Sequence, residues 1–472
     1  MSSHNSNPRG LPNEILLMIF EFVAADQEAY VRQDEPVSYD RSLSQRTLQS
    51  LVATCHRFKD LAWPLLYRCI SLPSPAQPRR LFQTLNQNSY LADKVQAILF
   101  FEQKEYPAVS HMPIRPEEPK KNWLVNALSF VNWLIERQDG PRLSTLSDHR
   151  NAHEAANAVR ELLVLLMSLP NLRLLRYAGL ETDTVFHMIL RTAMFKIANE
   201  PPGPFTRDFL HATEELHVSG FQANEWCHLV STHALAAVPS LRALRISYPF
   251  RRLRPAHFPH PRLPATSGDG IPSTIRDLRL SGPFHRTTDI EKILRRTQAL
   301  EIFHWDIPMN SYHRLIACLP GFKRLVHKHR ETLTELRVSA KYGPGGIMQP
   351  NTNTDPDTWS CSFAAYSRLR ILQVPEAVFY LHAPLPADLR LRDLLPPNVE
   401  VFILHTRDAR THVSWLMERL AMDEAASLSS CLKRVVVKED MASFFDIGAR
   451  SDLGRAAELF ADCGVAFVHE GV

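Results

Sequence analysis

A short apolar pattern recurs along most of the chain and constrains its fold more than any other feature of the sequence. In each copy, an apolar residue is followed by a second one three positions later and by a third one two positions after that. The last two apolar residues flank a polar residue in most copies, as in a strand with one buried face. From Leu172 onward the copies return at an irregular spacing of roughly 30 residues, which is within the range of solenoid repeats. They begin at Val95, Leu172, Thr213, Leu241, Ile275, Leu300, Leu333, Leu369, Val399 and Leu432, and the copy at Thr213 is the weakest.

Helical apolar patterns lie between several copies, at residues 159–166, 290–294 and 413–420. Strands and helices that alternate at this spacing predict an α/β fold, an irregular solenoid of parallel strands with helices on the outer face. The alternative is an unrelated, doubly wound α/β domain. Ten strand units over about 380 residues would be long for one such domain, which favours the solenoid.

The core of the pattern, L-x-x-L-x-L, resembles the leucine-rich repeat. That family places Asn or Cys three positions after the third apolar residue. In this chain Leu180, Pro249, Pro283, Pro308 and Lys341 stand there instead. No asparagine ladder can therefore be assumed, and we expect an irregular arc.

Three stretches interrupt the repeats, at residues 103–121, 250–272 and 342–358. They are rich in Pro or in Gly, Asn and Thr, and such compositions bury little surface. We interpret them as plain linkers. The alternative is that they emerge on the binding face of the solenoid, as long insertions in repeat proteins often do.

Residues 11–23 precede the repeats and are mostly apolar. At helical spacing Ile15 and Ile19 share one face, and Leu16 and Phe20 share the next. Pro12 suits the first turn of a helix, because its missing N–H would have no partner there. An apolar surface this wide predicts a helix that is buried on more than one side.

A second apolar segment follows a polar, acidic insert at residues 24–43. Its apolar residues Leu48, Leu51, Val52, Cys55 and Phe58 have helical spacing, and we expect Ser44 to cap this helix and Pro64 to interrupt it. Two or three short helices in about 60 residues bury too little surface to be stable alone. The sequence therefore predicts a leftover apolar face of the kind that marks a protein partner site.

These two segments resemble the two halves of an F-box. The first half is Leu11-Pro12 with Glu14-Ile15-Leu16 and Ile19-Phe20, and the second is Leu51 with residues 54–58, 61–62, 64–67 and Ile70, as in many fungal F-box proteins. The insert at 24–43 is longer than the usual link between the first two helices. The alternative interpretation is an ordinary helical hairpin that covers one end of a larger core.

The F-box resemblance implies a module at residues 9–72 that binds the Skp-type adaptor of a cullin–RING ubiquitin ligase. The repeat region at 80–472 would then bind an unknown target protein, which makes the chain a non-catalytic substrate receptor. The runner-up is a repeat scaffold whose N-terminal helices only cap the solenoid, and deleting residues 1–75 is the experiment that separates the two. The predicted adaptor contacts are Leu11, Pro12, Ile15, Leu16, Ile19, Phe20, Leu51, Val52, Cys55 and Phe58.

The remaining sequence features favour neither catalysis nor a cofactor. A net charge of +4 in 472 residues suggests no nucleic-acid or membrane surface, and the seven cysteines have no metal-binding spacing. The N-terminus lacks the apolar segment of a signal peptide, so we expect an intracellular protein, cytoplasmic or nuclear. His257, His260, His327 and His329 suit solvated positions better than metal sites. An enzyme that uses Cys227 or His228 is the distant third class of function.

Overall fold

The structure is a computed structural model of the whole chain. It describes residues 11–32, 43–72, 77–101, 165–166, 168–178, 210–219, 238–247, 274–281, 287–307, 326–340, 362–375, 391–406, 431–439 and 447–471. The predicted insertions at 103–121, 250–272 and 342–358 lie outside these residues, as do the helical patterns at 159–164 and 413–420. The chain divides into two compact units, one of residues 1–221 and 233–241 and the other of residues 222–232 and 242–472.

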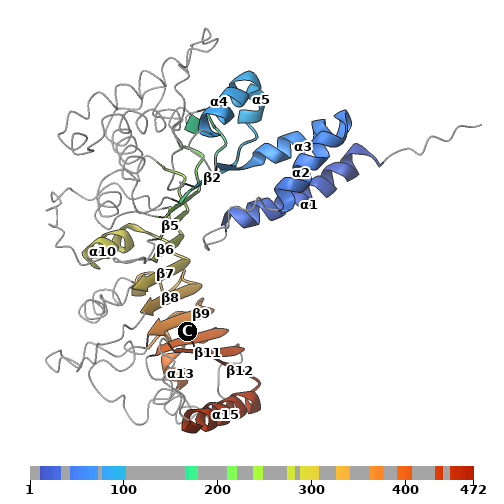
Figure 1. Ribbon diagram of the computed structural model, residues 1–472. Coiled ribbons are helices and arrows are strands. Elements are labelled where there is room, and N and C mark those ends of the chain that lie inside the picture. The colour runs from blue at the N-terminus through green and yellow to red at the C-terminus, as the bar shows by residue number, and fades with distance from the viewer. Residues whose placement is uncertain are drawn as a thin grey trace, which may run out of the picture. The chain divides into compact units, whose positions relative to one another are not determined.

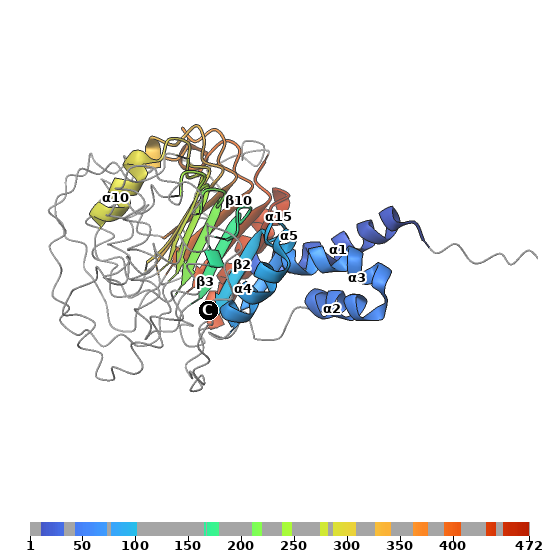
Figure 2. The same ribbon diagram turned by 90° about the horizontal axis from the view of Figure 1, so that it is seen from above.

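Three helices begin the first unit (Figures 1 and 2). They are α1 (Asn13–Arg32), α2 (Leu43–Thr54) and α3 (His56–Arg68), and each packs against the other two. Helices α4 (Gln77–Gln87) and α5 (Ser89–Ala92) follow. The first hydrogen bond of α1 runs from the Leu16 N–H to the Pro12 carbonyl over 3.1 Å, so Pro12 stands at the helix start, as predicted.

The helix boundaries differ from the sequence prediction at four places. Ser44, the predicted cap of the second helix, is the second residue of α2. The second apolar segment is two helices, because Cys55 is extended (φ −160°, ψ 164°) and its carbonyl accepts the bond from Lys59 N–H over 2.9 Å that starts α3. Pro64 lies inside α3 and does not end it. Helix α1 continues to Arg32, through much of the insert that the sequence suggested was a link. Apolar spacing alone does not reveal a one-residue break, since the spacing carries across it.

Parallel strands follow the helices in the first unit. They are β1 (Cys69–Leu72), β2 (Ala97–Phe101), β3 (Leu174–Ala178) and β4 (Glu215–Ser219), and each pairs with the next in chain order. Their register places Ile70, Ile98, Leu175 and Leu216 opposite one another.

The second unit repeats the arrangement with eight strands among its described residues. They are β5 (Ala243–Ser247), β6 (Asp277–Ser281), β7 (Ile302–Ile307), β8 (Glu335–Ala340), β9 (Ile371–Pro375), β10 (Val401–Thr406), β11 (Arg434–Glu439) and β12 (Ala466–Gly471). All neighbours are parallel and follow chain order. Helices α10 (Thr287–Arg296), α13 (Leu391–Leu394) and α15 (Ile447–Asp462) are described between strands.

The recurring triad forms the core of both units. Every one of its residues is buried, including the weak copy Thr213, Leu216 and Val218. The strand register stacks equivalent positions in rows, for example Leu244, Leu278 and Phe303. Ile290, Ile293 and Leu294 of α10 are buried too, as their helical spacing predicted. The predicted fold class is therefore confirmed: a helical N-terminal region is followed by parallel strands in a solenoid-like α/β arrangement, with twelve strands in the described residues.

Polar side chains stabilise the turns that enter several strands. Asn171 Nδ2 donates to the Asp93 carbonyl over 2.9 Å, and Thr332 Oγ1 donates to the Leu300 carbonyl over 2.7 Å. Both side chains stand directly before the first apolar residue of their repeat. The positions at which the leucine-rich repeat carries its Asn or Cys, from Leu180 to Lys341, lie outside the described residues.

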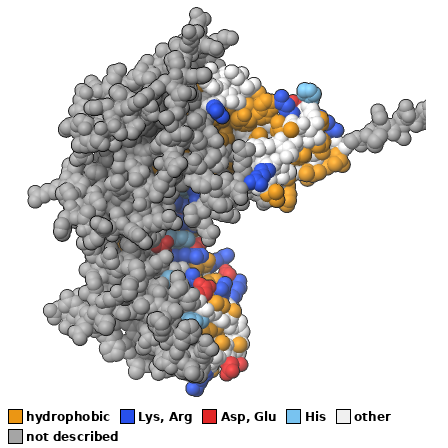
Figure 3. All heavy atoms as spheres, viewed as in Figure 1, with side chains coloured by type: hydrophobic (Ala, Val, Ile, Leu, Met, Phe, Trp, Pro, Cys, Tyr) orange, Lys and Arg blue, Asp and Glu red, His pale blue; other side chains and the backbone are white. Residues whose placement is uncertain are grey.

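The strand face opposite the triads carries paired charges in the second unit. Asp277 on β6 is 3.2 Å from an Arg245 nitrogen on β5 and 2.9 Å from Arg279 Nε on its own strand. Glu335 on β8 repeats this arrangement with His304 on β7, at 2.8 Å, and with Arg337. Figure 3 shows acidic and basic side chains side by side on the visible face.

Candidate functional site

Helix α1 carries apolar side chains on two opposite faces. One face is exposed, from 41% at Ile15 to 79% at Phe22. At 100° per residue its four helical members fall within about one third of the helix circumference, so they form one continuous stripe, and the fifth member, Leu11, stands two residues before the helix begins. We call this surface the α1 stripe; it consists of Leu11, Ile15, Met18, Ile19 and Phe22.

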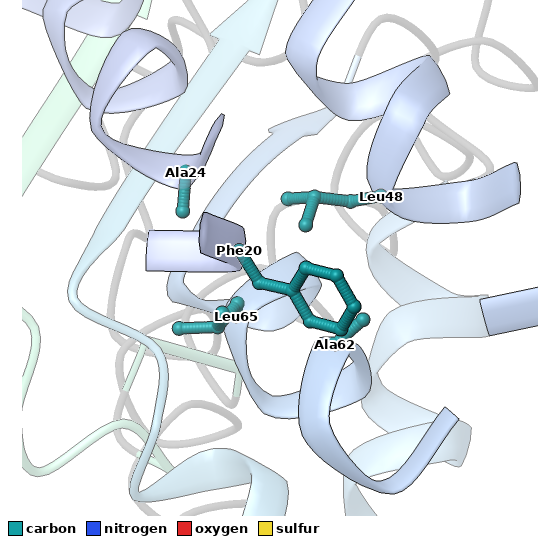
Figure 4. Close-up of a cluster of buried hydrophobic side chains, with 5 residues drawn as sticks. All are labelled: Phe20, Ala24, Leu48, Ala62 and Leu65. Carbon is teal, nitrogen blue, oxygen red and sulfur yellow. The ribbon is translucent and has the colours of Figure 1, made fainter. Parts of the chain in front are cut away.

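The opposite face of α1 forms the core of the helical module. Phe20 and Ala24 are buried there against Leu48 of α2 and against Ala62 and Leu65 of α3 (Figure 4). The Phe20 ring meets the Phe58 ring edge to face, with centroids 5.4 Å apart, which adds to the area-based stabilisation. The three helices therefore hold one another without using the α1 stripe.

The residues predicted to contact an adaptor divide between surface and core. Leu11, Pro12, Ile15, Ile19 and Cys55 are exposed. Leu51, Val52 and Phe58 are partly buried against the core, and Leu16 and Phe20 are buried. The sequence prediction omitted Met18 and Phe22, although both share the helical face of Ile15 and Ile19. The helix phase was the signal that could have found them.

Arg57 connects the start of α1 to α3. Its Nε donates to Asn13 Oδ1 over 2.7 Å, and its Nη2 donates to the Leu11 carbonyl. These two bonds join segments that are more than forty residues apart in sequence. One end of the α1 stripe is thus fastened to the rest of the module by a single guanidinium group.

Apolar chemistry dominates this site. Burying a large aliphatic or aromatic side chain stabilises a complex by roughly 1.5–3 kcal/mol, and the α1 stripe offers five such side chains. Glu14 and Glu21 are exposed elsewhere on α1 and stand outside the stripe. An exposed apolar patch bordered by polar residues is typical of a protein–protein interaction site.

The histidines and cysteines do not form a second site among the described residues. His329 is buried and does not occupy the solvated position that the sequence suggested. Its Nε2 lies 3.2 Å from both Thr297 Oγ1 and the Leu294 carbonyl, and burial lowers its pKa. The exposed His327 ring packs edge to face on Tyr366, at 5.9 Å between centroids. Within the described part of the chain no group of three or more His, Cys, Asp or Glu could hold a metal ion. Cys227, His228, His257 and His260 lie outside that part.

Comparison with known proteins identifies the helical region alone. The model of the F-box-like family matches residues 9–73, which contain all three helices and β1. No curated protein sequence matches the chain. Among the helices that the structure describes, there is none whose length and hydrophobicity would let it cross a bilayer. The chain thus contains an F-box-like domain, and domains of this family generally bind Skp-type adaptors.

Proposed function

We propose that this protein is the substrate-recognition subunit of a Skp–cullin–F-box ubiquitin ligase. The F-box-like match at residues 9–73 supports the adaptor half of the proposal. The repeat region, with its long ladder of parallel strands, supports the target half, because solenoids present extended binding surfaces. In this role the protein is not an enzyme and works in the cytoplasm or the nucleus.

The observation that carries the proposal is the α1 stripe. Five large apolar side chains stay exposed although the core of the module is complete without them. Leaving them in water has no benefit for the fold, whereas a partner that covers them gains their burial free energy. We therefore assign the adaptor contact mainly to the α1 stripe, together with the exposed Pro12 and Cys55. Leu16 and Phe20 contribute by shaping the helix from its buried side.

The receptor would accelerate ubiquitin transfer by proximity. Binding the adaptor through the helical module and the target through the repeat region raises the effective concentration of target lysines around a ubiquitin-charged enzyme. No residue of this chain needs to take part in the bond-forming step.

Replacing Ile15 with Glu tests the adaptor contact. A carboxylate placed in an apolar interface without a partner costs several kcal/mol, so we expect Ile15→Glu to weaken adaptor binding at least about 100-fold. Ile15 is 41% exposed, so the free protein should keep its helical circular dichroism and its unfolding temperature. The measurement is biolayer interferometry of the full chain against a purified Skp-type adaptor.

Glu21→Gln is the matched control for this experiment. It also changes the charge of α1 by one unit, but Glu21 lies outside the α1 stripe. We expect adaptor binding within twofold of the unaltered chain. If Ile15→Glu bound the adaptor as tightly as the unaltered chain, or if both variants lost the same amount of affinity, the assignment of the contact to the stripe would be contradicted.

The second candidate is a repeat scaffold without ligase function. The observation that favours it is that α1 lies next to β1 and β2, and α3 next to β1. Helices in that position could serve as the terminal cap that repeat arrays need. A cap, however, needs only the buried faces of these helices and does not account for the exposed stripe.

A further inference from the structure

We infer that Arg57 is a positioning residue for the adaptor contact, because it holds Leu11 and Pro12 in the conformation that a partner binds. This inference rests on the proposed function and extends it to a residue outside the apolar surface. Arg57 is the second residue of α3, and its side chain is exposed.

Among the described residues, the start of α1 has few restraints besides the bonds from Arg57. Leu11 and Pro12 precede the helix, and both are exposed. The backbone hydrogen bond of this segment runs from the Leu16 N–H to the Pro12 carbonyl. Chain segments at the end of a helix fray when little fastens them, and a partner that binds them must then order them at a cost in entropy. The two bonds from Arg57 reduce that cost before the partner arrives.

The geometry depends on a guanidinium group. Nε reaches the Asn13 side-chain oxygen while Nη2 reaches the Leu11 carbonyl, so two donors of one planar fork bind two acceptors on either side of Pro12. A lysine ammonium is a compact point charge and does not provide two donors with this fixed separation. Asn13 also gains a specific role, because its side-chain oxygen receives a bond from another helix at the position where α1 begins.

The consequence for binding is preorganisation. A residue that becomes ordered only on association costs binding free energy, whereas a residue that is already ordered does not. Ordering one residue weakens the affinity about tenfold. We expect Arg57→Gln to weaken binding of the full chain to a purified Skp-type adaptor about tenfold, and Arg57→Lys to recover only part of the loss. Asp60→Asn, an exposed change on the same helix, should bind within twofold of the unaltered chain.

A double-mutant cycle with Leu11→Ala separates positioning from general destabilisation. If Arg57 acts through Leu11, the combined variant should bind about as weakly as the weaker of the two single variants. Losses that add in full would overturn the inference, because they would mean that Arg57 and Leu11 act independently.

Hydrogen–deuterium exchange of the free, full-length protein tests the same inference without a partner. In Arg57→Gln, exchange should rise in peptides from residues 11–17 and stay unchanged in peptides around Ala62 and Leu65 of the core. Faster exchange in both regions, with a lower unfolding temperature, would show that Arg57 only stabilises the module and would overturn the positioning role. If the unaltered chain fails to bind the adaptor, the proposed function is wrong, whereas this exchange pattern still decides what Arg57 does.

Discussion

Phe20 and Phe22 are two residues apart on α1 and have the same side chain, yet 3% of one and 79% of the other is exposed. The difference arises from helix phase, since residues two apart point about 200° away from each other. Hydrophobicity alone does not distinguish a core residue from an interface residue. The sequence predicted an apolar surface wider than one buried face, and the structure leaves part of that surface exposed. Which face α2 and α3 cover depends on their packing.

The two phenylalanines should respond in opposite ways to truncation. Phe20→Ala removes a ring that packs on Phe58 and leaves a cavity, so we expect a loss of roughly 3–5 kcal/mol in the unfolding free energy of the helical module. Phe22→Ala removes an exposed ring and should change that free energy by less than about 0.5 kcal/mol.

Urea denaturation followed by circular dichroism measures the stabilities, and adaptor binding provides the second readout. Phe22→Ala should weaken binding while the module stays folded. Equal stabilities of the two variants would show that the division between the α1 stripe and the core is wrong.

At the scale of elements, every copy of the apolar triad marked a strand, but the copies did not mark all of the strands. Each of the ten copies coincides with a strand and is buried. The sequence analysis did not count two strands, β1 and β12. β12 has Gly464 at the first position of the triad and His469 at the third, whereas β1 fits the triad with Tyr67, Ile70 and Leu72 but lies directly after the helical segment to which the sequence analysis assigned it. The sheet register supplies the missing alignment, because Ile70 stands opposite Ile98 and Phe467 opposite Val435.

The charge pairs on the strand face were not predictable from single repeats, since each carboxylate joins its own strand to the preceding one. Glu335 is the clearest example. Burial alone would raise the pKa of Glu335, but the hydrogen bond and charge of His304 and the nearby Arg337 outweigh burial and lower the pKa to about 2. The carboxylate is therefore charged at neutral pH and ties β7 to β8.

Glu335→Gln should lower the stability of the second unit at pH 7 by about 1–2 kcal/mol, because the two bases lose their shared carboxylate. The pKa of Glu335 is lower in the folded protein, so its contribution is complete above pH 4.5 and is lost as the pH falls towards 2. The difference in unfolding free energy between the unaltered protein and Glu335→Gln should therefore shrink as the pH falls from 4.5 towards 2. Urea denaturation followed by circular dichroism and by tryptophan fluorescence, to which Trp305 on the neighbouring β7 contributes as one of seven tryptophans, measures it.

Glu400→Gln is the comparison for this prediction. Glu400 also pairs with two bases, Lys433 at 2.8 Å and Arg370 at 3.6 Å, but these pairs lie at the surface and should matter little. A Glu335→Gln protein as stable as the Glu400→Gln protein would mean that the strand-face pairs do not stabilise the sheet.

At the scale of the whole molecule, the sequence indicated a short helical module followed by a long repeat region. Residues 69–72, which lie inside the predicted module at 9–72 and inside the F-box-like match at 9–73, form β1, the partner of β2. The residue after the last turn of α3 is thus already part of the sheet. Local periodicity did not show this, because four residues are too few to distinguish a strand from the end of a helix.

This boundary changes how a truncation has to be designed. Deleting residues 1–75 removes β1 and uncovers β2, so aggregation of that fragment would not distinguish a receptor from a capped scaffold. Deleting residues 1–68 keeps β1. If the helices serve mainly to bind an adaptor, we expect the shorter deletion to stay monodisperse in size-exclusion chromatography and the longer one to aggregate. Aggregation of both fragments would support the capping role instead.

The exposed apolar stripe also has a consequence for the protein when its partner is scarce. A copy without an adaptor would expose five large apolar side chains to the cytosol or nucleoplasm. Exposed apolar patches of this kind bind chaperones and promote aggregation. Orphan copies should accordingly be short-lived or poorly soluble, and co-production with the adaptor should improve the yield of the protein.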